Sequence, residues 1–156
     1  MKTLLLYKSK WGSTKQYAEW IKEAVSSIEL ADLDTFDSSR LNDYDRIVIG
    51  SRVYMGRIQA QKYLVDNWNI LKNKKLYVFS VGLVPADSEE SKRSFELIPS
   101  YIRKYIDGYV KLPGRIIVSK ISFFNKLIVK LRKDMAADKV EKRFIKPIVE
   151  YLNTTN

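Results

Sequence analysis

The chain has 156 residues, of which 46% are hydrophobic and 29% charged, ordinary values for one folded domain. It has no cysteine and no histidine. This excludes a disulfide framework, a Ser-His-Asp triad, a cysteine nucleophile and the usual zinc sites. No acidic cluster has the spacing of metal ligands, so we expect no metal site. A bound cofactor is the expected source of any enzymatic chemistry.

The net charge of +10 is concentrated toward the end of the chain. Residues 99–156 carry 13 Lys and Arg against 5 Asp and Glu, whereas residues 1–98 carry 15 against 13. This asymmetry indicates a local basic surface. The apolar run at the N-terminus is too short for a signal peptide, and no stretch approaches the roughly 20 apolar residues of a transmembrane helix. We therefore expect a cytoplasmic protein.

Taken in chain order, apolar runs alternate with segments of helical spacing. Expected strands are 3–7, 28–33, 45–50, 75–81 and 109–118, and expected helices are 14–28, 60–71, 89–105, 122–135 and 139–152. Strands that are apolar throughout predict a parallel sheet with helices on both faces, an α/β three-layer sandwich in a single domain, 1–156. In such sheets ligands bind beyond the carboxyl ends of the strands. The loops after the first, third and fourth strands are therefore the candidate site.

The loop after the first strand has the composition of an anion site. A helix N-terminus offers unpaired N–H groups and the positive end of a dipole. Ser9, Ser13 and Thr14 add hydroxyl donors, Gly12 lets the backbone approach closely, and Lys10 adds charge. The alternative is that Ser13 or Thr14 only caps the helix. Residues 9–14 lack the glycine pattern of a dinucleotide fingerprint and the ending of a Walker loop.

The wider window, residues 5–21, resembles the signature of the flavodoxin family. It has two aliphatic residues and an aromatic, followed by Ser9, Gly12, Thr14, Ala18 and Ile21. The resemblance implies FMN as cofactor and a five-stranded sheet of order 2-1-3-4-5. It also implies that the FMN phosphate is wrapped by Ser9, Lys10, Trp11, Gly12, Ser13 and Thr14.

The sequence departs from the family at Lys8, where a Ser or Thr is common, and at Ser13, where Asn is frequent. We expect the positive charges of Lys8 and Lys10 to offset the missing hydroxyl.

The same resemblance places two further loops against the flavin ring. The first comprises Ser51, Arg52, Val53, Tyr54, Met55 and Gly56, and the second comprises Ser80, Val81, Gly82, Leu83 and Val84. Tyr54 is a candidate for stacking on the ring, the alternative being an incidental tyrosine in a surface loop. Carboxylates near a flavin lower its potential, and their scarcity here, together with Arg52, predicts a less negative potential.

A finer pattern resembles one branch of this family, the quinone-linked protoporphyrinogen oxidases. The matching segments are 1–4, 44–50, 77–84 and 124–131. The branch implies an oxidoreductase that oxidises protoporphyrinogen IX, an acidic porphyrin substrate, with a quinone as acceptor. The alternative is an electron-transfer flavodoxin with a protein redox partner, although such carriers are typically acidic. No residue can be assigned a catalytic proton-transfer role.

Two questions concern the basic surface. The segment 120–135 has Phe124, Leu127, Ile128, Leu131 and Met135 on one helical face and Lys126, Lys130 and Lys133 on another. It is either a closing helix packed on the sheet or an added helix that lies on an anionic membrane or a partner, which would make the protein peripheral at the inner face of the membrane. A nucleic-acid-binding module is a remote alternative, because the basic residues form no platform with aromatic residues. We therefore expect no nucleic-acid partner.

Overall fold

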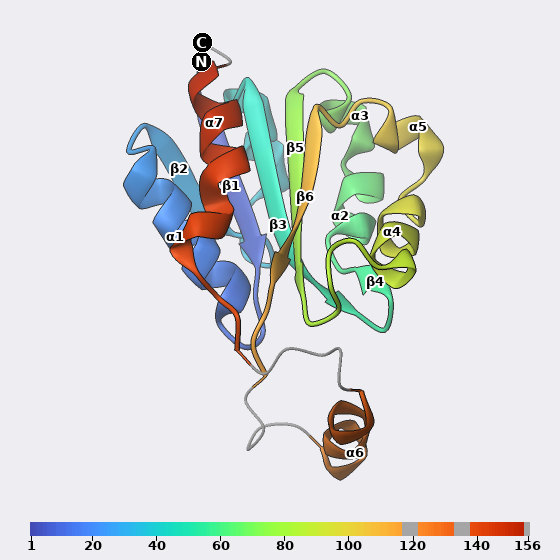
Figure 1. Cartoon of the computed structure of the whole chain (residues 1–156). Coiled ribbons are helices and arrows are strands. Elements are labelled where there is room, and N and C mark those ends of the chain that lie inside the picture. Colours follow the sequence, from blue (N-terminus) through green and yellow to red (C-terminus); the bar gives the residue numbers. More distant parts are fainter. Residues whose placement is uncertain (117–121, 133–137, 155–156) are drawn as a thin grey trace.

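The computed structural model of the chain describes residues 1–116, 122–132 and 138–154. Its centre is a twisted sheet with helices on both faces (Figure 1). The strands are β1 (Thr3–Lys8), β2 (Ile28–Asp32), β3 (Arg46–Tyr54), β4 (Arg57–Ile58), β5 (Lys75–Gly82) and β6 (Gly108–Pro113). The helices are α1 (Ser13–Ala24), α2 (Gln61–Asp66), α3 (Trp68–Leu71), α4 (Glu89–Glu96), α5 (Ser100–Arg103), α6 (Phe123–Leu131) and α7 (Lys146–Thr154), with 3-10 turns at Ser38–Asp43 and Lys142–Ile145.

The sheet order is β2-β1-β3-β5-β6, and all four pairings along this path are parallel. With the two-residue strand β4 left out of the numbering, this is the predicted order 2-1-3-4-5. Strand β4 is the addition, and it pairs antiparallel with the end of β3. The predicted fold class is confirmed, with this hairpin as a sixth strand.

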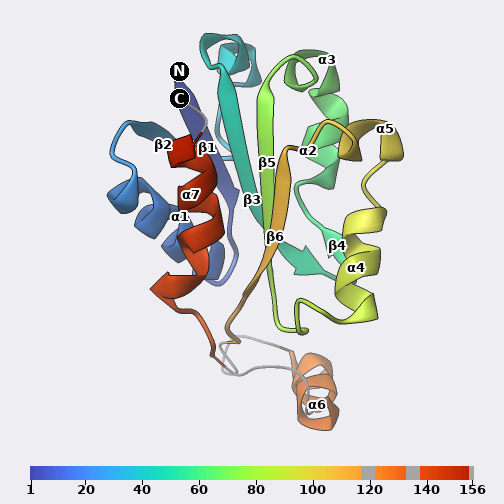
Figure 2. The ribbon, with the colours of Figure 1, turned by 45° about the horizontal axis from the view of Figure 1, so that its top comes forward.

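The two faces of the sheet carry separate cores. Successive side chains of a strand point to opposite faces, so each apolar strand contributes to both. Helices α2 to α5 cover one face, and α1 and α7 cover the other (Figure 2). The buried strand residues on the first face are Leu4, Leu6, Ile47, Ile49, Ile58, Leu76 and Val78, and those on the second are Leu5, Ile28, Val48, Tyr77, Phe79, Val81 and Leu112.

Strand β3 does not end at Gly50 as predicted but continues to Tyr54. A Cβ built on Gly50 would lie 1.9 Å from Cζ of the buried Phe79 on β5. Glycine is therefore needed at position 50 so that the Phe79 ring can cross the neighbouring strand. It marks a close approach within the sheet, and the residues predicted to form a loop after it begin as strand.

Two predicted helices are interrupted. The segment predicted as 60–71 is divided into α2 and α3 at Asn67, and that predicted as 89–105 is divided into α4 and α5 before Ser100. Pro99 precedes α5 and explains the second break, because proline lacks the N–H that would continue α4 and disfavours helical backbone in the residue before it. The end of the predicted fifth strand, 117–118, lies outside the described residues.

Helix α6 does not cover the sheet. None of its residues is buried, and it lies beyond the carboxyl ends of the strands (Figure 1). Residues 120–121 and 133–135 of the predicted segment 120–135, including Lys133 and Met135, lie outside the described residues. Among the described helices, none is long and apolar enough to cross a membrane.

We predict that Gly50→Ala lowers the free energy of unfolding by about 1–3 kcal/mol, because the added methyl group overpacks the site of Phe79. Chemical denaturation measures the change. Gly114→Ala is the matched control, since its Cβ would meet no atom closer than 3.4 Å. Combining Gly50→Ala with Phe79→Leu should recover part of the loss; purely additive effects of the two substitutions would contradict this steric explanation.

Candidate functional site

A cavity of about 340 Å³ lies at the carboxyl ends of the strands, and residues of α6 also line it. Its volume is within the usual range of small-molecule sites, about 300–1,000 Å³. Three segments predicted from the sequence line it together. They contribute Ser9, Lys10, Trp11, Ser13, Thr14, Arg52, Val53, Tyr54, Met55, Gly56, Val81, Gly82, Leu83 and Val84.

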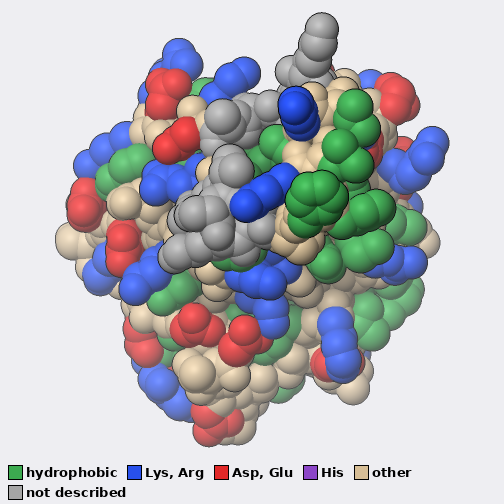
Figure 3. All heavy atoms as spheres, turned by 90° about the horizontal axis from the view of Figure 1, so that it is seen from below, with side chains coloured by type: hydrophobic (Ala, Val, Ile, Leu, Met, Phe, Trp, Pro, Cys, Tyr) green, Lys and Arg blue, Asp and Glu red, His purple; other side chains and the backbone are tan. Residues whose placement is uncertain are grey.

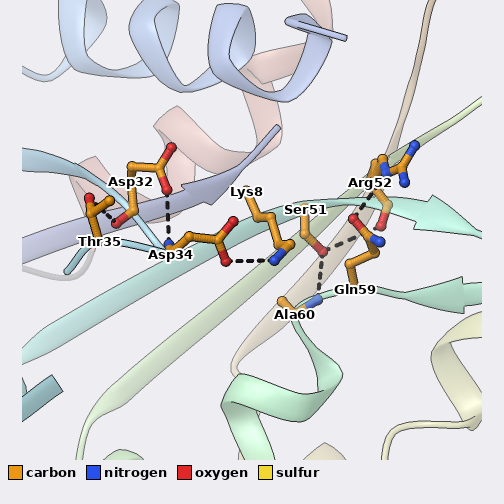
Figure 4. Close-up of polar contacts among 8 residues, drawn as sticks. All are labelled: Lys8, Asp32, Asp34, Thr35, Ser51, Arg52, Gln59 and Ala60. Atoms are coloured by element: carbon orange, nitrogen blue, oxygen red, sulfur yellow. Dashed lines mark hydrogen bonds and ion pairs between the residues drawn. The ribbon is translucent and has the colours of Figure 1, made fainter. Parts of the chain in front are cut away.

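Three of the predicted residues do not line the cavity, and each has another position. Gly12 forms the turn into α1, with a φ of 89° that favours glycine. Ser51 is fully buried, and its Oγ accepts a hydrogen bond of 2.9 Å from the Ala60 N–H (Figure 4). Ser80 is also fully buried and shares a hydrogen bond of 2.7 Å with the Tyr109 hydroxyl. Ser51 and Ser80 thus stabilise the strands behind the cavity through these hydrogen bonds.

The first wall of the cavity is the turn from β1 into α1. Gly12 is the N-cap of α1 and no described side chain caps the helix, so the alternative that Ser13 or Thr14 only caps it does not hold. The first turn of α1 contains no acidic residue. The Ser9 Oγ accepts a hydrogen bond of 3.1 Å from the Gly12 N–H and closes the turn. The uncapped helix N-terminus and the Thr14 side chain therefore face the cavity as an anion cradle.

The charge beside this cradle comes from Lys10 and Arg115, and Lys8 has a different role. Lys8 at the end of β1 forms an ion pair of 2.5 Å with Asp34, which Figure 4 shows, and it does not line the cavity. The Arg115 main-chain N–H donates to Ser13 Oγ at 3.3 Å. Its side-chain Nε is buried, has no hydrogen-bond partner among the described residues, and forms an ion pair of 3.8 Å with Asp138 Oδ1. This buried donor beside the cradle fits a site that receives an anion.

The second wall is the β3–β4 hairpin. Met55 and Gly56 form its turn with φ values of 49° and 74°, as in the two-residue turns that match the twist of a hairpin. Tyr54 and Met55 are exposed at the tip. The Arg52 guanidinium lies 4.5 Å from the centroid of the Tyr54 ring. Its Nε–H donates a hydrogen bond of 2.9 Å to Gln59 Oε1 (Figure 4). Burial lowers the pKa of Arg52, but arginine remains charged throughout the physiological range.

The third wall follows β5 and rests on β6. The Gly114 N–H donates a hydrogen bond of 2.9 Å to the Gly82 carbonyl oxygen, and the Tyr17 hydroxyl donates one of 2.7 Å to the Pro113 carbonyl oxygen. Burial raises the pKa of Tyr17 to about 12, so this hydroxyl stays protonated at neutral pH. The two bonds join the end of β6 to β5 and to α1. The cavity wall is therefore braced on both sides.

Sequence reasoning missed the residues that β6, α4 and α6 bring to the cavity. These are Glu90, Lys111, Gly114, Arg115, Ile116, Asn125, Ile128 and Val129. The fold class alone predicts that the end of β6 lies at the cavity, because every parallel strand of the sheet ends at this edge. The approach of α6 has no local sequence signal. An ion pair of 3.1 Å between Arg132 and Glu90 joins the end of α6 to α4.

The described part of the cavity lining is cationic and apolar. It contains Lys10, Arg52, Lys111 and Arg115 but a single carboxylate, Glu90. Its uncharged side chains are mainly aliphatic or aromatic. Among the described residues, no group of three or more acidic side chains could hold a metal ion. The site therefore suits a largely apolar ligand that carries negative charge.

Comparison with known proteins gives consistent findings. The family profile of the flavodoxin domain matches residues 4–143. A quinone-linked protoporphyrinogen IX dehydrogenase of Escherichia coli strain K12 is 22% identical, over 92% of this chain and 84% of that protein.

Solved structures share the fold. A Streptococcus pneumoniae TIGR4 flavodoxin is similar over the full length of both chains, with a TM-score of 0.62 and 14% identity. A flavodoxin from the domain Archaea covers 98% of this chain and 99% of its own, with a TM-score of 0.57 and 16% identity.

Proposed function

This chain belongs to the flavodoxin domain family, and we propose that it is an FMN-dependent oxidoreductase that oxidises protoporphyrinogen IX with a quinone as electron acceptor. Bound FMN supplies the electron-transfer chemistry. The chain has no cysteine or histidine, so the cofactor is the source of this chemistry. The observation that carries the proposal is the cationic cavity, with its anion cradle at one wall and apolar segments at the others.

The cavity has a place for each part of FMN. The phosphate fits the N-terminus of α1, where N–H groups and the Thr14 hydroxyl are available and where Arg115, ion-paired with Asp138, adds positive charge. The ring fits between the hairpin and the segment after β5, where Val53, Leu83 and Val84 offer apolar surface. These residues bind and orient the cofactor, and the scarcity of carboxylates beside the ring favours a less negative potential.

Two features favour a porphyrinogen over a protein redox partner. The substrate's propionate groups are anionic, and Arg52 near the exposed hairpin tip can pair with one of them. The net charge of +10 opposes association with the basic surfaces that acidic electron carriers recognise. The relative from E. coli supports the same substrate and acceptor for this chain. An electron-transfer flavodoxin is the competing function, since its fold and cofactor are the same.

Helix α6 supplies a means of reaching a membrane quinone. Phe123 and Leu131 are 85% and 73% exposed, and Phe124 is 69% exposed. Figure 3 views this end of the molecule and shows hydrophobic side chains gathered with Lys and Arg among them. Apolar side chains together with Lys126 and Lys130 suit the surface of an anionic bilayer. We therefore include peripheral membrane contact through α6 in the proposal.

The cradle predicts selectivity for the phosphate. Thr14→Val should weaken FMN binding about tenfold or more, because a hydrogen bond to a charged group is lost, but leave riboflavin binding unchanged. Fluorescence titration of the apoprotein with each ligand measures both affinities. Thr154→Val, at the exposed end of α7, is the control. If Thr14→Val weakened riboflavin binding and FMN binding equally, the phosphate would not lie at the N-terminus of α1.

The substrate assignment predicts that the FMN-loaded protein oxidises protoporphyrinogen under anaerobic conditions when menaquinone is supplied. Arg52→Gln should raise the KM for protoporphyrinogen about tenfold with a smaller change in kcat, since it removes one charge pair in binding. Porphyrin fluorescence follows the reaction. Rapid reduction by a flavodoxin reductase without protoporphyrinogen oxidation would favour the electron carrier instead.

The exposed face of α6 predicts binding to anionic vesicles. Phe123→Ser combined with Phe124→Ser should lower the partition coefficient about tenfold, because less apolar surface enters the bilayer. Sedimentation with phosphatidylglycerol vesicles measures it, and Val65→Ser on the exposed side of α2 is the control. Unchanged sedimentation of the double variant would rule out α6 as the contact.

A further inference from the structure

Lys111 is a buried cation at the wall of the cavity. It lies on β6, is 9% exposed, and lines the cavity together with Gly82. A Cβ built on Gly82 would lie 3.2 Å from the Lys111 Cε and 3.5 Å from its Nζ. Glycine at position 82 therefore leaves the space that the lysine side chain occupies. The ammonium group thus reaches the segment after β5, away from the cradle at α1.

In the described part of the chain, one neutral partner holds this ammonium group. The Lys111 Nζ donates a hydrogen bond to Ser91 Oγ in α4. Within residues 1–116, 122–132 and 138–154, it forms no ion pair with a carboxylate. The nearby carboxylate, Glu90, lies 3.1 Å from the Arg132 guanidinium. Burial lowers the pKa of Lys111, and the Glu90 charge opposes this shift only in part.

A buried ammonium group with one neutral partner is costly to keep in a fold. An apolar side chain of the same length would fill the space beside Gly82 without that cost. The charge is therefore best explained by a ligand in the cavity that brings negative charge to this wall. Because the phosphate has its own cradle at α1, the ligand atoms opposite Lys111 belong to the ring end.

We propose that the positive charge of Lys111 stabilises the reduced form of the bound flavin relative to its oxidised form. This rests on the proposed function, since it requires FMN in the cavity. Reduction adds two electrons to the ring, and when it takes up only one proton the ring gains a net negative charge. The electrons come from the substrate, and a fixed cation beside the ring favours the charged product.

Lys111→Met tests the proposal, with Lys75→Met as its control. Both substitutions remove one positive charge, but Lys75 is exposed at the opposite end of β5. Dissociation constants are measured anaerobically for oxidised FMN and for dithionite-reduced FMN. We expect Lys111→Met to raise the ratio of the reduced to the oxidised constant at least tenfold over wild type, equivalent to a midpoint potential lower by about 30 mV for two electrons. Lys75→Met should stay within twofold.

The outcomes separate this inference from the proposed function. If wild-type protein binds no FMN, both fail together. If Lys111→Met binds oxidised FMN and the ratio is unchanged, only the role of Lys111 is overturned. Denaturation of the apoprotein adds a readout that needs no cofactor: the unfolding midpoint should rise in Lys111→Met, because an uncompensated buried charge is removed. A lower midpoint would contradict the premise. Failure of Lys111→Met to fold would contradict it in the same way, and Lys111→Gln, which keeps a polar group for Ser91, would then show whether loss of that hydrogen bond is the cause.

Discussion

Parallel hydrogen bonding across β2, β1, β3, β5 and β6 is the constraint on which the site depends. Because all of these strands run in one direction, every carboxyl end lies at the same edge of the sheet. The turn into α1, the β3–β4 hairpin and the segment after β5 meet there although they are far apart in the sequence. Packing supports this edge, since both faces of the sheet are covered by helices and the Phe79 ring lies against Gly50.

The strands and the positions of the loops that line the cavity could be predicted because their signals are local. A strand buried on both faces is apolar throughout, and the turn from β1 into α1 has a compact pattern of small and hydroxyl residues. The end of β3 could not be predicted from Gly50, because a sequence does not distinguish a glycine that makes room for a neighbouring ring from one that ends a strand. Pro99 was a local signal that the prediction of one helix over 89–105 did not use.

The rest of the site depends on contacts across the fold. Arg115 reaches the cradle through its bond to Ser13, more than 100 residues away in sequence. Lys111 reaches the cavity because β6 pairs with β5 and because Gly82 leaves space. Lys8 was expected to act on the phosphate, but Asp34 from the turn after β2 takes its charge. Pairings of this kind have no periodic pattern that a single sequence can reveal.

The central claim is that the N-terminus of α1 holds the phosphate of FMN as a dianion, out of water. Phosphorus NMR of the FMN-loaded protein tests it directly, because the second pKa of a phosphate monoester is about 6. The account predicts a resonance that does not move between about pH 5 and 8, since the cradle and Arg115 stabilise the dianion across that range. A resonance that titrates near pH 6 like free FMN would show a solvent-exposed phosphate and contradict the account.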